Sequence, residues 1–331
     1  MKQTLAAILA TSVHGIVIHA PAGSNFDFGS SKCPCVGIAG LEGTIEVKLN
    51  KTTTADFPAD FGARCEAWDN KRNSLYCMPG QKPGADNGWC KEPYCYVDPC
   101  NCDLDIPPTK SGSYTPGASY QGKGLWYSYA TCGGKDYWME AETKKKQQED
   151  NGVCAKKIDE KKWGKKSCRC VGYEDAPGNL NVTMGKKDFE YPAEAGASCE
   201  SWDAKRHPDC MGDKPADWCK QAWCYVDPCE CDLEVPPKTS SYLPSGLVNG
   251  KPVYFSYATC GASDSYSATN KEACVAQNSE NNCTKLDKCA WNGTACLGKD
   301  IVQACSAKSS AGAIKASFAL ALSLLAASFA A

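Results

Sequence analysis

Residues 89–104, WCKEPYCYVDPCNCDL, decide the fold of this protein, because residues 218–233 repeat them as WCKQAWCYVDPCECDL. Twelve of the sixteen positions are identical, and both copies hold four cysteines in the same register. We call this segment the central motif. Cysteines at this density, with Trp and Tyr beside them, are typical of the centre of a disulfide-stabilised module. The sequence therefore predicts two related modules, each organised around one central motif.

The cysteine content of the whole chain indicates an oxidising compartment. The chain has 331 residues, which is enough for two or more domains. Its 24 cysteines are about 7% of the sequence, close to the level of a disulfide scaffold. Cytosolic thiols are kept reduced, so we expect these cysteines to be oxidised in a secreted protein.

Zinc binding is the main alternative use of clustered cysteines. Structural zinc sites usually draw on Cys-x2-4-Cys pairs, often together with histidine. The closest pairs here are Cys-x-Cys, and the only histidines are His14, His19 and His207. We therefore expect disulfides, and neither a metal nor another cofactor.

The charge pattern gives no indication of a nucleic-acid partner. The net charge is −2, without the basic footprint that nucleic-acid binding leaves on a sequence. Lysines gather between residues 144 and 166, but acidic residues are interleaved with them. We expect a solvated linker or a surface helix in that segment.

The first residues have the pattern of a secretory signal peptide. A lysine at position 2 precedes a short apolar region, and Ala20-Pro21-Ala22 offers a small-residue cleavage site. Pro21 disfavours cleavage after Ala20, so cleavage is predicted after Ala22. Residues 1–22 are then removed, and His207 is the one histidine of the mature protein.

The last residues have the pattern of a glycosylphosphatidylinositol (GPI) attachment signal. Ser309, Ser310 and Ala311 are a triplet of small residues, and an apolar tail occupies 318–331. A transmembrane helix is the alternative, but the tail is shorter than the ~20 residues a spanning helix needs. We expect attachment at Ser309, with Ser310 as second choice, removal of 309–331, and display on the extracellular face of the plasma membrane.

Four sequons can accept N-linked glycans if the chain enters the secretory pathway. They begin at Asn50, Asn181, Asn282 and Asn292. The sequon at Asn282 is the doubtful one, because its middle residue is Cys283, which is expected to be oxidised.

The internal repeat extends well beyond the central motif and sets the predicted domain boundaries. FPADFGARCEAWD at 57–69 corresponds to YPAEAGASCESWD at 191–203, and LWYSYATCG corresponds to VYFSYATCG. We place repeat 1 at 23–140, a charged linker at 141–166 whose Cys154 belongs with repeat 1, repeat 2 at 167–274 and a short Cys-rich stalk at 275–308.

Each repeat is predicted to contain two short strands. Apolar residues alternate at Ile45, Val47 and Leu49, and again at 180, 182 and 184, as in a half-buried strand. The aromatic segment before each Tyr-Ala-Thr-Cys-Gly is the second strand. Turn-forming Gly, Pro, Asn and Asp lie between the strands. The predicted fold class is therefore small, disulfide-rich, mainly β and loop-rich modules in two tandem copies with a stalk.

The cysteines divide into units of even number, which lets each unit close without a free thiol. The connectivity stays open, but a Cys-x-Cys pair would close a strained ring, so its two members are expected to bond to different partners. The expected disulfide cysteines are Cys33, Cys35, Cys65, Cys77, Cys90, Cys95, Cys100, Cys102, Cys132 and Cys154 in repeat 1, Cys168, Cys170, Cys199, Cys210, Cys219, Cys224, Cys229, Cys231, Cys260 and Cys274 in repeat 2, and Cys283, Cys289, Cys296 and Cys305 in the stalk.

Three resemblances follow from these motifs. The central motif is slightly similar to the kringle motif, but kringles have fewer cysteines in a shorter unit, so their fold is not transferred. The fuller pattern, from residue 33 to 261, resembles Cys-rich repeats of secreted and surface proteins of unicellular algae and related protists, and this resemblance implies no particular activity. Residues 274–305, with a central Trp291, resemble the small stalk modules of the plexin-semaphorin-integrin kind that support ectodomains. The position of this segment just before the attachment signal indicates a spacer.

The sequence offers little for nucleophilic catalysis. A Ser-His or Cys-His mechanism needs a base, and His207 lies in a polar turn, where a surface histidine is expected. Carboxylates are present in both copies, and a glycosidase needs two of them across a cleft. Asp98 and Asp227 precede prolines and are expected to cap turns. Asp103 with Asp105 could hold calcium, although no EF-hand-like loop is present.

Aromatic residues near the acids of the central motif are the preferred binding patch, since exposed aromatic faces stack on sugars or on partner side chains. The candidate binding residues are Asp103, Asp105, Asp232, Glu234, Tyr94, Trp223, Trp126 and Tyr254.

We thus expect a non-enzymatic, GPI-anchored protein that acts in adhesion, in recognition or as a coat component. Its expected partners are surface glycans or other cell-surface and extracellular proteins, with two copies giving avidity. The alternatives are a carboxylate-dependent hydrolase of surface glycans, and a metal-binding protein with free Cys-x-Cys thiols.

Overall fold

The computed structural model describes residues 27–70, 72–73, 75–78, 88–111, 114–136, 151–265, 274–303 and 305. The predicted signal peptide, the first part of the charged linker and the predicted attachment site at Ser309 lie outside these residues. Among the helices that the structure does describe, none has the length and apolar character needed to span a membrane.

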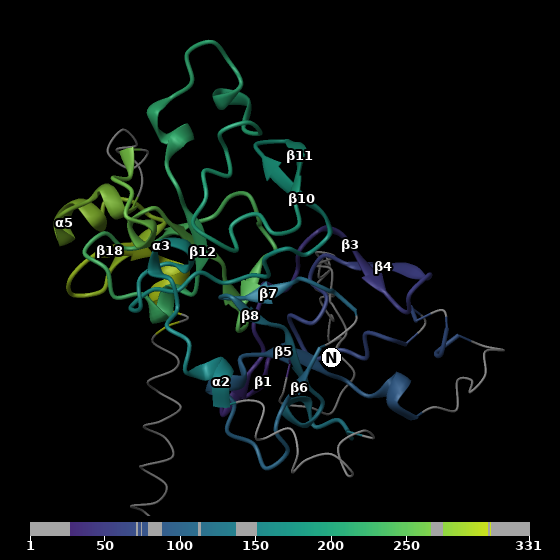
Figure 1. Cartoon of the computed structure of the whole chain (residues 1–331). Coiled ribbons are helices and arrows are strands. Elements are labelled where there is room, and N and C mark those ends of the chain that lie inside the picture. The colour runs from purple at the N-terminus through teal and green to yellow at the C-terminus, as the bar shows by residue number, and fades with distance from the viewer. Residues whose placement is uncertain are drawn as a thin grey trace, which may run out of the picture.

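The fold consists of short strands, short helices and loops, which confirms the predicted fold class (Figure 1). Repeat 1 and the segment after it contain β1 (Gly29–Ser30), β2 (Cys33–Pro34), β3 (Gly43–Lys48), β4 (Thr54–Pro58), η1 (Gly88–Lys91), β5 (Cys95–Val97), η2 (Pro99–Asn101), β6 (Thr109–Lys110), β7 (Ser119–Tyr120), β8 (Lys123–Gly124), β9 (Trp126–Ser128), η3 (Ala130–Cys132), α2 (Asn151–Cys154) and α3 (Glu160–Trp163). Repeat 2 contains β10 (Gly178–Met184), β11 (Lys187–Pro192), η4 (Pro208–Cys210), η5 (Asp217–Lys220), β12 (Cys224–Val226), η6 (Pro228–Glu230), β13 (Lys238–Thr239), β14 (Leu247–Val248), β15 (Lys251–Pro252), β16 (Tyr254–Ser256) and η7 (Ala258–Cys260). The C-terminal segment contains η8 (Cys274–Ala276), α5 (Glu280–Cys283), β17 (Cys289–Trp291) and β18 (Cys296–Gly298).

The strands that alternation predicts are present in both repeats. In β3 and the residue after it, Ile45, Val47 and Leu49 are buried, while the residues between them are exposed. Leu180 and Val182 of β10 are buried in the same way. The aromatic segments form β9 and β16, each of which is the middle strand of a three-stranded antiparallel sheet. The two-residue period of the sequence therefore predicted these strands correctly.

All 24 cysteines are paired, in twelve disulfides, as expected for an oxidised protein. Each Cys-x-Cys pair bonds to two different partners, which confirms the geometric expectation. The pairs of repeat 1 are Cys33–Cys102, Cys35–Cys95, Cys65–Cys132, Cys77–Cys90 and Cys100–Cys154. The pairs of repeat 2 and the C-terminal segment are Cys168–Cys231, Cys170–Cys224, Cys199–Cys260, Cys210–Cys219, Cys229–Cys305, Cys274–Cys289 and Cys283–Cys296.

The assignment of Cys274 to repeat 2 is wrong. Cys274 bonds to Cys289, and the partner of Cys229 is Cys305. The Cys229–Cys305 bond corresponds to the Cys100–Cys154 bond of repeat 1. The loop that this bond closes in repeat 2 therefore contains an additional small unit, with η8, α5, β17 and β18. We call residues 274–305 the C-terminal module. Counting alone could not separate the two allocations, because both give even numbers.

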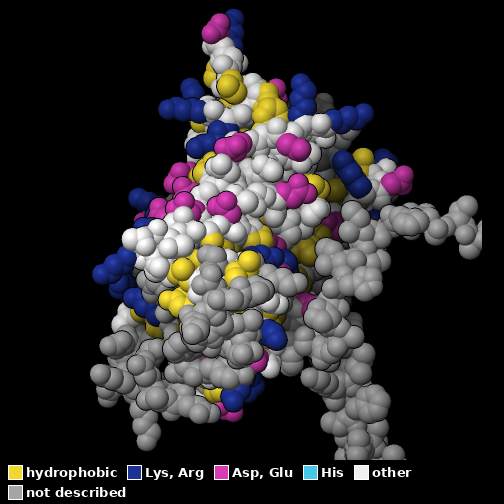
Figure 2. Space-filling model, turned by 90° about the vertical axis from the view of Figure 1, so that its right-hand side faces the viewer, with side chains coloured by type: hydrophobic (Ala, Val, Ile, Leu, Met, Phe, Trp, Pro, Cys, Tyr) yellow, Lys and Arg dark blue, Asp and Glu magenta, His cyan; other side chains and the backbone are white. Residues whose placement is uncertain are grey.

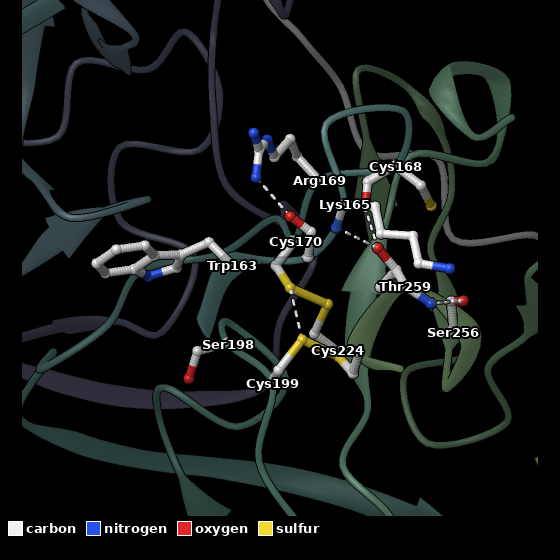
Figure 3. Close-up of a disulfide and its surroundings, with 12 residues drawn as sticks. Trp163, Lys165, Cys168, Arg169, Cys170, Ser198, Cys199, Cys224, Ser256 and Thr259 are labelled. Carbon is white, nitrogen blue, oxygen red and sulfur yellow. Dashed lines mark hydrogen bonds between the residues drawn. A yellow bond between two sulfur atoms is a disulfide. The ribbon is translucent and has the colours of Figure 1, made fainter. Parts of the chain in front are cut away.

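The repeated Ser-Tyr-Ala-Thr-Cys-Gly segment has a structural role in both copies. In repeat 2, the Thr259 backbone N–H donates to the Ser256 hydroxyl at 3.1 Å. The Thr259 hydroxyl donates to the Cys168 carbonyl and accepts from the Lys165 N–H, as Figure 3 shows. Thr131 makes the equivalent bonds to Ser128 and Cys33 in repeat 1. This threonine therefore fastens the end of each repeat to its opening Cys-x-Cys segment.

The two repeats share one four-stranded antiparallel sheet, in the order β11-β10-β3-β4. In Figure 1 the teal β10 and β11 lie beside the purple β3 and β4, although more than a hundred residues separate them in the chain. The junction pairs Gly178 with Ile45 and Leu180 with Gly43. A Cβ at Gly178 would lie 2.1 Å from the Thr44 carbonyl oxygen, so glycine is needed for this close approach.

The two repeats also exchange hairpins in a reciprocal way. The β14–β15 hairpin of repeat 2 reaches repeat 1, where Ala39 and Leu247 exchange backbone hydrogen bonds of 2.8 and 2.9 Å. The β7–β8 hairpin of repeat 1 reaches repeat 2, where Ser119 and Glu174 exchange two bonds of 3.0 and 2.9 Å. Since residues 39 and 174 are equivalent, the repeats are related like the subunits of a symmetric dimer.

Side chains are exchanged between the repeats together with the hairpins. Ile38 of repeat 1 packs in the hydrophobic core of repeat 2, and the equivalent Tyr173 packs in the core of repeat 1. The Tyr173 hydroxyl donates to the Val36 carbonyl at 2.6 Å. The repeats therefore form one interlocked body and not two independent modules on a string.

Candidate functional site

The predicted aromatic binding patch is not on the surface. Tyr94, Trp126, Trp223 and Tyr254 are all buried, with at most 4% of each residue exposed. Tyr94 packs between Tyr127 and Tyr129, so it belongs to the core of repeat 1. The prediction of an exposed patch of these four residues is wrong, because the rings are packed in the interior, although Trp223 and Tyr254 also line a cavity described below. On the face drawn in Figure 2, basic and acidic side chains are interspersed, with small groups of hydrophobic side chains between them.

The acids of the central motif lie apart from those aromatic residues. Asp103, Asp105, Asp232 and Glu234 are exposed. The Asp103 side chain is 93% exposed, and its only ion pair among the described residues is a 3.9 Å contact with Lys32. Buried rings and exposed acids cannot form one surface, so the structure does not bring these predicted residues together.

The aspartates before proline do cap turns, as expected. Asp98 accepts from the Cys100 N–H at 3.0 Å, and Asp227 accepts from the Cys229 N–H at 2.9 Å. Each also pairs with a buried lysine from the hairpin of its own repeat. Lys123 lies 2.8 Å from both Asp98 oxygens, and Lys251 lies 3.3 Å from the nearer Asp227 oxygen. Their role is therefore structural.

The described residues of repeat 2 and the C-terminal module enclose a cavity of about 630 Å³. This volume is within the roughly 300–1,000 Å³ typical of small-molecule sites. Its aromatic wall consists of Trp218, Trp223, Tyr242, Tyr254, Phe255 and Tyr257. Figure 1 shows the C-terminal module, with α5 and β18, beside β12 of repeat 2.

Asp203 fixes the aromatic wall. Its carboxylate accepts from Trp223 Nε1 at 2.7 Å, from the Tyr242 hydroxyl at 2.9 Å and from the Tyr191 hydroxyl at 3.0 Å. Burial, together with the Asp203 charge, raises the pKa of Tyr242 well above its ordinary value, so this phenol stays a neutral donor. These bonds orient the rings and leave Asp203 without a cationic hydrogen-bond partner among the described residues.

His207 lies in the cavity wall, whereas the sequence predicts a position on the surface. Its side chain is 16% exposed, and its ring lies 4.9 Å from the Trp218 ring and 6.1 Å from the Tyr242 ring. Its Nδ1 accepts from the Asp209 N–H at 3.1 Å, which places the proton of the neutral imidazole on Nε2. The histidine is thus an oriented part of the cavity.

Lys238 is a buried cation in the wall. It forms an ion pair with Asp264, and its Nζ lies 5.3 Å from the Tyr257 ring centroid and 5.7 Å from that of Phe255. Burial lowers the pKa of Lys238, while the bond to Asp264 acts in the opposite direction. Because Asp264 balances it, Lys238 adds no net charge to the cavity.

The C-terminal module supplies the opposite wall. Asp300 accepts from the Tyr254 hydroxyl, with its two oxygens at 3.1 and 3.2 Å, and Lys288, Val275 and Gly298 also line the cavity. Ile301 packs in the same hydrophobic cluster as Tyr254. The module was expected to be a spacer; it is instead packed against repeat 2 and completes the site.

Repeat 1 differs at the positions that line the cavity. Asn73 replaces His207, is fully buried, and donates to Asp69 and Tyr114. Thr109 replaces Lys238. In addition, only one cysteine lies between residues 132 and 168, so repeat 1 has no counterpart of the C-terminal module. The site is therefore specific to repeat 2, and the differences between the copies were the signal that sequence reasoning missed.

Each repeat also brings four sulfur atoms within 4.8 Å of one another. In repeat 2 they come from the neighbouring disulfides Cys170–Cys224 and Cys199–Cys260, the first of which is drawn in Figure 3. Thiolates and not disulfide sulfurs bind metals, so these sulfurs are not ligands in the oxidised protein.

The sequons are accessible in the folded chain. Asn50, Asn181, Asn282 and Asn292 are all exposed. Cys283, the middle residue of the doubtful sequon, is indeed oxidised and is fully buried. Glycosylation itself remains a prediction.

Comparison with known proteins gives no relative. No family model, no curated protein and no solved structure matches this chain. The twelve disulfides by themselves indicate an extracellular or secreted protein.

Proposed function

We propose that this protein is a non-enzymatic recognition protein of the cell surface, which binds part of its ligand in the cavity of repeat 2. The ligand is carried by surface glycans or by other extracellular proteins. The proposal includes secretion through the N-terminal signal peptide and attachment to the membrane through a GPI anchor at Ser309.

The observation that carries the proposal is the cavity of about 630 Å³. Two of its rings, Trp223 and Tyr242, are held by hydrogen bonds to the buried Asp203 carboxylate, so their orientation is fixed before a ligand arrives. Rigid aromatic walls reduce the entropy lost on binding. No described residue in the wall is a free cysteine, and the one histidine is oriented by a backbone N–H, which suits binding better than nucleophilic chemistry.

Alanine substitutions of one wall residue and, separately, of its counterpart in repeat 1 test the cavity directly. Trp218→Ala removes a half-buried ring from the wall, and Trp89→Ala removes the equivalent half-buried ring of repeat 1. We expect Trp218→Ala to reduce binding of the soluble ectodomain to cell surfaces at least tenfold, as loss of a binding hot spot does at roughly 1.4 kcal/mol or more. Trp89→Ala should leave binding unchanged. Equal binding of wild type and Trp218→Ala would refute the proposal.

The anchor is tested separately on intact cells. A phosphatidylinositol-specific phospholipase should release the protein into the medium, while Ser309→Leu combined with Ser310→Leu should prevent surface display. Protein that stays on the membrane after phospholipase treatment would exclude the lipid anchor without affecting the recognition role.

A further inference from the structure

The charges around the cavity are not balanced. Asp203, Asp209 and Asp300 line it, together with Lys238 and Lys288. Lys238 is neutralised by Asp264, which leaves three carboxylates against one exposed lysine. Asp203 accepts hydrogen bonds from indole and phenol donors, and Asp300 accepts one from a phenol, so the donors to both carboxylates are neutral. The cavity lining therefore carries an excess of negative charge, which is buried at Asp203 and exposed to solvent at Asp209 and Asp300.

The aromatic rings also favour a positively charged ligand. A ring presents a negative face, which attracts ammonium and guanidinium groups. Two rings of this wall, Phe255 and Tyr257, already have the Lys238 ammonium over them. The rings of Trp218, Trp223 and Tyr242 line the remainder of the wall, with Asp203 bonded to two of them.

From this arrangement we infer that the cavity binds an organic ammonium group, held by Trp218, Trp223 and Tyr242 with Asp203 and Asp300 as counter-charges. The inference rests on the proposed function and specifies its ligand class. A neutral sugar could donate hydroxyl hydrogen bonds to the carboxylates but would not be attracted by their charge, whereas an anionic ligand would be repelled by them.

A pair of isosteric probes separates charge from shape. Choline carries a quaternary ammonium, and its neutral carbon isostere, a dimethylbutanol, has nearly the same size without the charge. We expect choline to bind to the full-length mature protein at least about tenfold more tightly in a calorimetric titration, the size of a desolvated cation–π contact. Equal or tighter binding of the neutral isostere would overturn the inference while leaving the recognition function in place.

A conservative variant tests the counter-charge. Asp300→Asn keeps an oxygen that can accept from Tyr254, and it removes one negative charge. We expect it to weaken choline binding severalfold and to leave binding of the neutral isostere unchanged. The control is Asp287→Asn, an exposed aspartate of the same module that does not line the cavity. Unchanged choline binding in Asp300→Asn would contradict the assignment of Asp300.

Two sources of the ammonium group are distinguished by a further arm. Displacement of the soluble ectodomain from cell surfaces by free choline would identify an ammonium group on the cell-surface ligand, and choline binding without such displacement would identify a soluble ligand. Failure of the wild type to bind choline would refute the inference. The Trp218→Ala cell-binding result would still decide the proposed function independently.

Discussion

Buried ion pairs are the residue-scale device that both repeats share. Lys123 and Asp98 are each less than 9% exposed and make two contacts of 2.8 Å, and Asp98 also caps η2. Such a pair stabilises little relative to a well-packed apolar pair, but breaking it leaves one charge buried without its partner. The pair therefore fixes the position of the β7–β8 hairpin more than it adds to stability.

Replacing only the lysine should destabilise the protein more than replacing both partners of the pair. We expect Lys123→Met to lower the free energy of unfolding by about 3–5 kcal/mol, because Asp98 keeps a buried charge. The double variant Lys123→Met with Asp98→Asn should be the more stable of the two, although it loses part of the cap. Denaturant unfolding at neutral pH measures both. A double variant less stable than Lys123→Met would contradict this account.

A second residue-scale prediction concerns pH. Burial raises the pKa of Asp69, against hydrogen bonds from Tyr114, Asn73 and Tyr94 that lower it. A pKa raised in the folded state gives a stabilising contribution that is complete below the pKa of the unfolded chain and is lost as the pH rises through the folded value. The stability of the wild type relative to Asp69→Asn should therefore increase as the pH falls from neutral to about 4. Denaturant unfolding across that range measures it, and a constant difference would refute the prediction.

At the scale of elements, the junction of the shared sheet depends on two glycines. Gly43 and Gly178 have φ angles of +132° and +143°, and a Cβ on either would lie within 2.2 Å of a carbonyl oxygen of the other repeat. We expect Gly178→Ala to destabilise the protein by at least about 1–3 kcal/mol, from strain and from separation of β10 and β3. Gly212→Ala is the control, since its Cβ would meet nothing within 4 Å. Similar melting temperatures for both variants would contradict this role.

The elements also show what the sequence could and could not predict. Ile45 and Val47 identified β3 because alternation is a local signal of one buried face. The pairing of β3 with β10 was not predictable, since each strand pattern allows many partners. The repeat alignment made Trp218 equivalent to Trp89 and Trp223 equivalent to Tyr94, but the predicted exposure of Trp223 was wrong. The cavity was not predicted, because it depends on His207, Lys238 and the C-terminal module. Repeat 1 lacks these features, so the similarity between the two copies contains no signal for them.

At the scale of the whole molecule, the interlocked repeats should unfold together. They share a sheet, exchange hairpins and place Ile38 and Tyr173 in each other's cores. Loss of either repeat would remove part of the core of the other, so we expect one cooperative calorimetric transition with matching van't Hoff and calorimetric enthalpies. Two resolved transitions, of which a substitution in one repeat shifts only one, would show that the repeats unfold as independent modules.

The disulfide between Cys229 and Cys305 has a mechanical consequence. Tension applied to the chain after Cys305 passes across one sulfur–sulfur bond to Cys229, beside η6 of repeat 2. The backbone from 230 to 304 lies outside that load path, and it includes Lys238, Asp300 and most of the aromatic wall. A pull on the chain after Cys305 would therefore not extend residues 230–304, even if the C-terminal module separated from repeat 2.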